Sequence, residues 1–465
     1  MTLIRSISGI RGTIGGVPGE GLTPDDVVRY TAAFASFLME YYAKPKLRMV
    51  IGRDARISGY VVNKLAIGTL EAMGIDVTDI GLTTTPTAEM AVTRFGADGG
   101  IILTASHNPK QWNALKLLNA SGEFISASDG ARVLEIAETQ SYRYADVDNL
   151  GHSECDNTML DWHIQQILSL PLVDAEAIAK AGFRVAVDAV NSTGGIAIPA
   201  LLRSLGVKEI IELNCDPSGR FAHNPEPLPE NLREISELMT HSKAHLGIVV
   251  DPDVDRLALV CEDGGMFGEE YTLVAVADYV LSKTGGNTVS NLSSTRALQV
   301  VTEKAGYAYA ASAVGEVNVV DLMKSTNAVI GGEGNGGVIY PALHYGRDAL
   351  VGVALFLSHL AHSGKKCSMF RRQYPDFFIS KNKIELFAGI DTDKIMAEMK
   401  VRYQMMHINT TDGIRIDFGE EWVHLRKSNT EPIIRIYSES DTMGKADHLA
   451  GKILGDIREI VKMMI

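Results

Sequence analysis

Short apolar runs rich in β-branched residues alternate with amphipathic stretches of helical length through most of this 465-residue chain. Strands that alternate with helices in this way are typical of βαβ units, which build mostly parallel sheets. We therefore predict an α/β fold for the greater part of the chain. The apolar runs are Leu47–Ile51, Gly100–Thr104, Phe183–Val187, Leu246–Val250, Thr288–Leu292 and Asn327–Ile330.

The C-terminal part of the chain has a different pattern, in which strands dominate and one helix closes the chain. This pattern indicates an α+β domain. Its expected elements are the strands Lys383–Phe387, Gly413–Phe418, Trp422–Arg426 and Pro432–Ser438 and the helix Lys445–Met464. Because one hydrophobic core rarely grows to 465 residues, we predict several domains. Their expected ranges are 1–152, 153–260, 261–375 and 376–465.

The formal net charge of −13 argues against nucleic acid or an anionic membrane as the main partner. This charge also repels phosphorylated ligands, so a phosphate site needs a local cluster of donors. No apolar run is long enough for a transmembrane helix, and the four cysteines lie too far apart in sequence for a zinc site or a disulfide framework. We expect a cytoplasmic protein.

The first loop with reactive side chains is Thr104–Pro109, directly after an apolar run. Ligands of open α/β sheets gather beyond the carboxyl ends of the strands, where this loop is expected. Ser106 has His107 and Lys116 close by in sequence and could carry a phosphoryl group covalently. The same residue types also make an ordinary polar turn.

The second loop is Asp251–Arg256, between two apolar runs. Its proline disfavours a helix, so we predict an extended segment. In such a segment the carboxylates of Asp251, Asp253 and Asp255 project toward one side. Three such charges repel one another unless a cation lies among them, and hard oxygen ligands suit Mg²⁺.

This acidic loop has other interpretations. An EF-hand is excluded because Arg256 occupies the position where that motif requires glycine. A solvated acidic turn remains possible. So does a phosphatase with an aspartyl nucleophile, in which Asp251 would be the covalent carrier and Ser106 would have no role.

The third loop, Gly331–Gly337, is rich in glycine, which lets a backbone approach a ligand closely. Glu333 supplies an anionic acceptor and Asn335 both a donor and an acceptor, a pair suited to sugar hydroxyls. A glycine-rich turn without a ligand is the alternative.

The fourth loop, Arg426–Pro432, is followed by Arg435 and concentrates guanidinium groups, hydroxyls and an amide. Arginine binds phosphate bidentately, and hydroxyls and loop amides complete such a site. A hairpin turn with surface arginines is the alternative. All four loops together, in this order, are far less probable by chance than any one of them.

The set resembles the α-D-phosphohexomutase superfamily over essentially the whole chain. The segments TASHNP, DPDVDR, GEGNGG and RKSNTEPIIR resemble its phosphoserine, metal, sugar and phosphate loops, and SGIRGT and GRD near the N-terminus also look familial. The resemblance implies three related α/β domains with mixed sheets and a C-terminal α+β domain around a central active-site cleft.

The resemblance further implies a reaction that interconverts hexose 6-phosphates and 1-phosphates through phosphorylated Ser106. Mg²⁺ would be bound by this phosphate with Asp251, Asp253 and Asp255. The phosphoryl group would pass to the substrate to form a hexose 1,6-bisphosphate, and Ser106 would then take back the other one. No further cofactor is implied, and the partners are small hexose phosphates.

Roles for the remaining residues follow from the same resemblance. Lys116 is expected to be the general base, with a pKa lowered by its surroundings, and Arg256 to stabilise the transferring group. Arg11 and His107 would orient groups nearby, while sugar hydroxyls would be bound by Glu333 and Asn335. The non-reacting phosphate would be bound by Arg426, Ser428, Asn429, Thr430 and Arg435.

The chain departs from the family pattern at the sugar loop, where Asn335 replaces serine and Gly337 replaces histidine, and at Ala114, where glycine is usual. Within the superfamily we favour interconversion of glucosamine 6-phosphate and glucosamine 1-phosphate, because the length and the Thr-Glu-Pro of the last loop resemble that branch. The alternative is the branch acting on mannose and glucose phosphates. The phosphatase and a catalytically inactive sugar-phosphate sensor are more distant alternatives.

Overall fold

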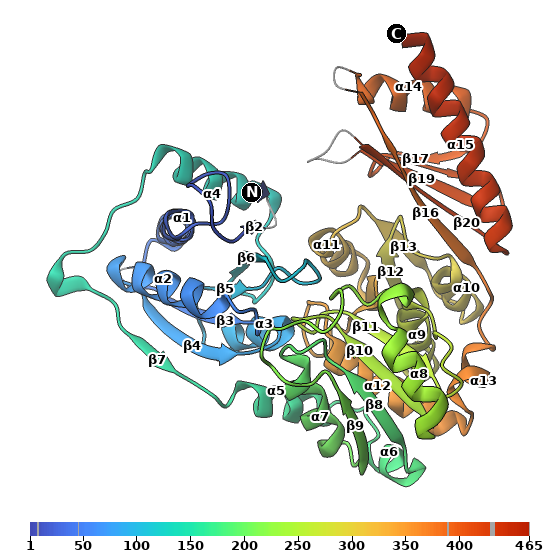
Figure 1. Cartoon of the computed structure of the whole chain (residues 1–465), viewed down its shortest axis with the longest axis horizontal. Coiled ribbons are helices and arrows are strands. Elements are labelled where there is room, and N and C mark those ends of the chain that lie inside the picture. The colour runs from blue at the N-terminus through green and yellow to red at the C-terminus, as the bar shows by residue number, and fades with distance from the viewer. Residues whose placement is uncertain (7–8, 45, 388–389, 428–432, 465) are drawn as a thin grey trace. The chain divides into compact units, whose positions relative to one another are not determined.

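The computed structural model describes the chain except residues 7–8, 45, 388–389, 428–432 and 465 (Figure 1). The described chain divides into two compact units. The first unit comprises Met1–Thr272 and Asn335–Phe370, and the second comprises Leu273–Gly334 and Arg371–Ile465. Among the described helices, none combines the length and the apolar character needed to cross a membrane.

The N-terminal sheet of the first unit is mixed, with the strand order β1-β2-β6-β5-β3-β4-β7. Alternate residues of β3 and β5 point to opposite faces; α1, α2 and α4 cover one face and α3 and α5 the other. Both faces of the central strands are therefore buried. The strands are β1 Leu3–Ser6, β2 Gly9–Thr13, β3 Arg48–Arg53, β4 Asp76–Leu82, β5 Gly99–Leu103, β6 Trp112–Asn119 and β7 Ser153–Cys155. The helices are α1 Pro24–Tyr42, α2 Gly59–Ala72, α3 Thr85–Arg94, α4 Ala127–Thr139, η1 Val147–Asn149 and α5 Met159–Leu168.

A second sheet of the first unit has the order β11-β10-β8-β9, in which only the pair β10–β11 is antiparallel. Its elements are β8 Arg184–Asp188, β9 Glu209–Leu213, β10 Leu246–Val250, β11 Leu257–Cys261, α6 Ala175–Ala181, α7 Gly194–Ser204, η2 Pro229–Asn231 and α8 Arg233–Ser242. β15 Gly337–Ile339 and α12 Ala349–Ser363 also belong to this unit. β10 is buried throughout, as expected for a strand covered on both faces.

The second unit contains three parallel strands in the order β13-β12-β14 and an antiparallel sheet in the order β16-β20-β19-β18-β17. The apolar side of α15 packs on the antiparallel sheet. Two helices, α9 Glu269–Thr284 and α13 Cys367–Arg371, pass from one unit to the other in sequence. The other elements are β12 Asn287–Asn291, α10 Ala297–Lys304, β13 Tyr309–Ser312, α11 Glu316–Thr326, β14 Ala328–Glu333, β16 Phe378–Glu385, α14 Thr392–Arg402, β17 His407–Asn409, β18 Ile414–Asp417, β19 Trp422–Lys427, β20 Ile433–Ser440 and α15 Met443–Met464.

The predicted fold class is confirmed, with mixed α/β sheets followed by an antiparallel α+β domain. The run Leu246–Val250 matches β10 residue for residue, and the other apolar runs lie within a few residues of their strands. The largest shift is in β16, which begins at Phe378 rather than Lys383. This strand is at the edge of its sheet, so polar residues interrupt its apolar pattern. The four domain ranges and the central cleft remain predictions.

Candidate active site

The serine loop connects the end of β5 to the start of β6, which returns antiparallel beside it. Ser106 has a φ of 47°, a left-handed conformation that is uncommon for a residue with a side chain. Its N–H donates to Thr104 Oγ1 at 2.9 Å, and only 7% of the residue is exposed. The loop therefore holds this hydroxyl in a defined and nearly buried position.

A buried arginine fixes the shape of this loop. Arg56 pairs with Asp54 across 3.0 Å between Nε and Oδ2, and both side chains are fully buried. Its other nitrogens donate to four backbone carbonyls of the serine loop and of the start of β6, those of Ser106, Asn108, Pro109 and Trp112. One guanidinium thus ties four loop carbonyls together, of which that of Pro109 also accepts a hydrogen bond from the N–H of Trp112.

The acidic loop connects the antiparallel strands β10 and β11, and it is not extended as predicted. It turns instead: the N–H of Val254 donates to Asp251 O at 3.1 Å, and Val254 has a φ of 62°. A left-handed conformation is costly for a β-branched residue and is often found at functional sites. The three carboxylates converge because the loop folds back, not because of strand alternation.

The carboxylates of Asp251, Asp253 and Asp255 are fully buried, and one oxygen from each lies within 4.8 Å of the others. Oδ1 of Asp253 and Oδ1 of Asp255 accept no hydrogen bond from the described residues. Burial and the two neighbouring carboxylates raise the pKa of Asp251 well above its usual range. Closely spaced buried acceptors of this kind fit a hard divalent cation such as Mg²⁺.

The serine loop and the acidic loop meet. Ser106 Oγ donates to Asp251 Oδ2 at 2.8 Å, although 145 residues separate them in sequence. α3 holds the acidic loop from another side, since Thr85 donates its N–H to Asp253 O at 2.8 Å and its hydroxyl to Asp253 Oδ2 at 2.6 Å. The serine hydroxyl thus lies directly beside the proposed metal ligands.

Four more predicted site residues surround this junction. Lys116 Nζ lies 2.8 Å from Asp253 Oδ2, and His107 Nδ1 lies 3.4 Å from the hydroxyl oxygen of Ser106. The backbone N–H of Arg256 donates to Asp251 Oδ1 at 3.2 Å. Arg11 pairs with Ala114, two residues before Lys116 on β6, so Arg11 and Lys116 share one face of the sheet.

The charge states of two of these residues follow from their surroundings. Burial opposes the charge of Lys116, but the carboxylates of Asp253 and Asp255 outweigh it and raise the lysine pKa. The expected lowering of this pKa is therefore wrong for the described surroundings. Burial and the nearby charge of Arg256 lower the pKa of His107 to about 2, so this imidazole is neutral.

The predicted sugar-binding residues fall in different units. In the second unit, Glu333 is buried at the end of β14, where Oε1 accepts hydrogen bonds from Asn291 Nδ2 at 2.9 Å and from the N–H of Gly315 at 3.1 Å. In the first unit, Asn335 Oδ1 accepts a hydrogen bond from the N–H of Gly337 at 3.2 Å. Both side chains are thus held by neighbouring backbone or amide groups.

The predicted phosphate-binding residues lie on the C-terminal sheet. Arg426 of β19 stands directly opposite Arg435 of β20, and Lys383 of β16 stands opposite Arg435 on its other side. Cross-strand like charges are destabilising unless anionic groups balance them, so the row is suited to a phosphate, although Glu385 already pairs with Lys383 across 3.1 Å. Asp412 supports Arg426 across 2.7 Å. Ser428, Asn429 and Thr430 lie outside the described residues.

Comparison with known proteins decides the family. Four profiles match in order: phosphoglucomutase/phosphomannomutase alpha/beta/alpha domain I over residues 4–143, domain II over 161–265, domain III over 268–377 and the C-terminal domain over 387–455. The chain belongs to the phosphoglucomutase/phosphomannomutase family. This family is the one that the four sequence loops indicated.

Relatives match over nearly their full length. A protein of Thermococcus kodakarensis named phosphoglucomutase/phosphomannomutase is 34% identical over 94% of this chain and 95% of its own length. A "probable phosphoglucosamine mutase" of Methanopyrus kandleri is 31% identical over 98% of both chains. A crystal structure of a family protein from Burkholderia thailandensis has a TM-score of 0.83 and 24% identity, covering 99% of this chain and 98% of that one, which shows a shared fold.

Three residues of this family member's site escaped the sequence analysis. Arg56 and Thr85 hold the serine loop and the acidic loop, and Arg347 Nη2 donates to Asp255 Oδ2 at 2.6 Å. Arg56 follows the Gly-Arg-Asp segment that looked familial, which was the only signal for it. Thr85 and Arg347 lie far from the acidic loop in sequence, so only the fold reveals them.

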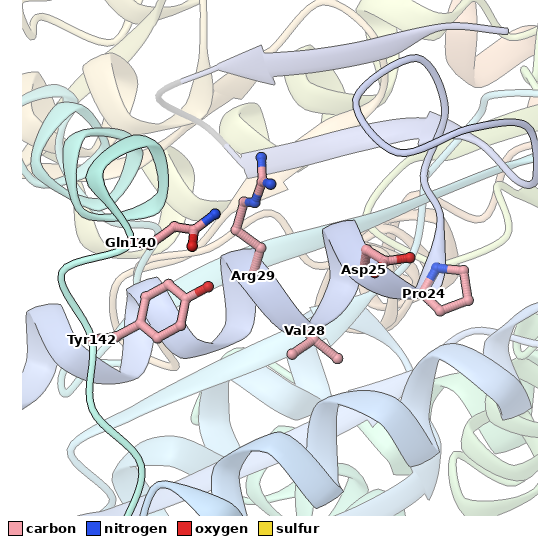
Figure 2. A pocket seen from close by; sticks show the side chains of 6 residues that line it. All are labelled: Pro24, Asp25, Val28, Arg29, Gln140 and Tyr142. Carbon is pink, nitrogen blue, oxygen red and sulfur yellow. The ribbon is translucent and has the colours of Figure 1, made fainter.

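A surface hollow of about 330 Å³ in the first unit is lined by the start of α1 and by the segment after α4 (Figure 2). Arg29 is the one basic side chain among its described lining residues, which are Pro24, Asp25, Val28, Arg29, Gln140 and Tyr142. None of these is a predicted site residue. The hollow is therefore separate from the serine and acidic loops.

Because Arg56 joins a buried ion pair to four loop carbonyls, we expect Arg56→Met to destabilise the protein by about 3–5 kcal/mol, the cost of leaving a buried charge unpaired. Urea unfolding measures this change. Arg132→Met is the matched control, since Arg132 pairs with Glu40 and Glu135 on the surface and should cost less than about 1 kcal/mol. Equal effects of the two substitutions would contradict the anchoring role of Arg56.

Proposed function

We propose that this protein is a phosphohexomutase that moves a phosphoryl group between O6 and O1 of a hexose phosphate through Ser106. The observation that carries the proposal is the 2.8 Å hydrogen bond between Ser106 Oγ and Asp251 Oδ2. It places a potential phosphoryl carrier beside a buried carboxylate triad, as phosphoryl transfer requires. We keep the cytoplasm as the proposed location, as expected of a metabolic enzyme of this family.

We infer that Asp251, Asp253 and Asp255, together with a phosphate on Ser106, bind Mg²⁺. The fit rests on full burial of the three carboxylates and on the two oxygens that accept no hydrogen bond from described residues. When bound, the ion would neutralise negative charge on the transferring phosphoryl group.

The reaction begins with phosphorylated Ser106 and a hexose monophosphate. The bond from phosphorus to the seryl oxygen breaks as a bond from phosphorus to the free sugar hydroxyl forms. The sugar hydroxyl loses its proton to a base, and the seryl oxygen takes up a proton. The products are unphosphorylated Ser106 and a hexose 1,6-bisphosphate, which then returns its other phosphoryl group to Ser106 by the reverse step.

The surrounding side chains supply the proton and charge requirements of this step. Neutral His107 lies 3.4 Å from the seryl oxygen and is suited to exchanging the seryl proton. The raised pKa keeps Lys116 protonated, so its positive charge is suited to stabilising phosphate. To act as the general base, Lys116 must first lose that proton. Arg256 and Arg11 would stabilise phosphoryl oxygens.

Binding of the non-reacting phosphate is assigned to the basic row of the C-terminal sheet. Arg426 and Arg435 face each other across two strands, and Ser428, Asn429 and Thr430 would complete the site. Glu333 and Asn335 would bind sugar hydroxyls. The two half-reactions require the substrate to bind in two orientations. A site that binds only the non-reacting phosphate can hold the substrate in both.

The preferred sugar separates two candidate functions. We favour phosphoglucosamine mutase activity, and several relatives carry that name. The relative with 34% identity is named phosphoglucomutase/phosphomannomutase, which supports the second candidate. In a coupled assay with Mg²⁺ and a trace of hexose 1,6-bisphosphate, we expect activity on at least one of the glucosamine, glucose, mannose and N-acetylglucosamine phosphates, with the highest kcat/KM for glucosamine.

A highest kcat/KM for glucose or mannose would reverse the preference within the family. Inactivity on all four sugars would overturn the mutase proposal. The phosphatase alternative is distinguished by the position of covalent phosphate, because it places the phosphate on Asp251 rather than Ser106. Peptide mapping by mass spectrometry locates it, and inactivity with no covalent phosphate at either residue would favour the sugar-phosphate sensor.

A further inference from the structure

A second cluster of metal-ligating side chains lies in the first unit, built from α5 and the segment that leads into α12. His163 Nε2 lies 3.0 Å from Asp348 Oδ2, and His344 Nε2 lies 3.3 Å from the same oxygen. His163 and Asp348 are fully buried, and 15% of the His344 side chain is exposed. Two imidazoles thus direct the same type of nitrogen toward one carboxylate oxygen.

The second nitrogen of each imidazole also has a neighbour on α3. Thr87 Oγ1 lies 2.9 Å from His163 Nδ1, and Glu89 Oε2 lies 3.4 Å from His344 Nδ1. Histidines that bind a metal through one nitrogen usually donate their other N–H to a carboxylate or another oxygen, which fixes the ring orientation. His163 has this arrangement with Thr87, whereas Glu89 lies at ion-pair distance from His344 without a hydrogen bond, and α3 supplies both neighbours.

We propose that His163, His344 and Asp348 bind a transition-metal cation of the Zn²⁺ type. The three ligand atoms lie within 4.8 Å of one another. For bonds of about 2.0–2.1 Å, tetrahedral geometry places neighbouring ligand atoms about 3.3–3.4 Å apart, so small adjustments admit an ion. Imidazole nitrogen favours Zn²⁺ and related metals over Mg²⁺. This distinguishes the cluster from the all-oxygen triad.

The proposed site is linked to the acidic loop by two short routes. Arg347, which precedes Asp348, donates to Asp255 at 2.6 Å. On α3, Thr85 donates to Asp253 at 2.6 Å, two residues before Thr87 and four before Glu89, the residues that neighbour the two histidines. A bound ion would therefore join α3, α5 and the segment before α12 into one rigid support for the acidic loop. The inference does not depend on the mutase proposal.

The experiment uses the full chain, stripped of metal with EDTA and titrated with Co²⁺ in the presence of excess Mg²⁺. Co²⁺ with imidazole ligands in tetrahedral geometry absorbs visible light strongly, whereas an all-oxygen octahedral site gives only weak bands. We expect one equivalent of strongly absorbing Co²⁺, displaced by Zn²⁺ and not by Mg²⁺.

Loss of an outer partner typically weakens metal binding by about 10- to 100-fold, so Glu89→Gln should weaken Co²⁺ affinity to that extent.

His344→Gln should abolish the strong absorption, because it removes a ligand. His223→Gln is the matched control. His223 has 16% of its side chain exposed, and its Nε2 lies 3.2 Å from Asp188 Oδ2, so it pairs with a carboxylate as His344 does but outside the proposed metal site. This control should bind Co²⁺ like the unmodified protein.

The melting temperature without metal shows whether each variant folds. Added Zn²⁺ should raise the melting temperature of the unmodified protein but not that of His344→Gln. If the unmodified protein lacks the strong absorption, or folded His344→Gln retains it, the three residues form only a hydrogen-bond network.

Discussion

Ser106→Ala will lower the mutase rate by roughly 10⁴- to 10⁶-fold, the loss typical when a covalent nucleophile is removed. The substitution removes the hydroxyl that the serine loop places 2.8 Å from Asp251 Oδ2. Two measurements check this: the coupled assay with the best sugar phosphate, and transfer of labelled phosphate from hexose 1,6-bisphosphate to the protein. Both should fall to background.

Ser36→Ala is the matched control for this substitution. Ser36 lies on α1 of the same domain and has the same exposed fraction as Ser106, 7%. Loss of this hydroxyl should leave the rate and the labelling within about 2-fold. No hydrogen bond joins Ser36 to the serine loop or the acidic loop within the described chain, and changes at small buried hydroxyls are generally mild. Full labelling of folded Ser106→Ala would show that another residue carries the phosphate and would sink the proposed mechanism.

Asp255→Asn should lower kcat by about 10³-fold, because a catalytic cation contributes several kcal/mol and the neutral amide weakens its binding. Chelation of the unmodified protein should cause a comparable loss, which Mg²⁺ reverses. For Asp255→Asn, the Mg²⁺ concentration that restores half of the remaining activity should be much higher. Activity measured across a Mg²⁺ titration provides both quantities.

Asp188→Asn is the control for a buried carboxylate outside the triad. Asp188 is the last residue of β8, in the sheet that also contains β10 and β11. It pairs with His223 rather than with the serine loop or the acidic loop. Its substitution should affect stability while leaving the Mg²⁺ requirement unchanged. If both variants show the same Mg²⁺ dependence, or if chelation has no effect, the triad is not the metal site.

Much of this fold could be predicted because local patterns encode it. Strands buried on both faces, such as β10, are continuous apolar runs bounded by turn residues, and such runs are visible without any tertiary information. Ser106 and the three aspartates could be singled out as candidate site residues for a related reason, since ligands of open α/β sheets gather at the loops that follow such strands. The edge strand β16 was placed less well because its exposed positions break the pattern.

The sequence alone determined the α/β architecture and the four loops, because periodicity and short motifs are properties of neighbouring residues. The motifs of these loops also carried the resemblance to the family. The tertiary structure decided how distant loops meet: that Ser106 reaches Asp251, that the acidic loop turns through a left-handed Val254, and that Arg56 anchors the serine loop. It also reversed the expected pKa shift of Lys116, since that shift depends on carboxylates more than 130 residues away. Proximity and burial are set by packing between segments, and no local pattern records them.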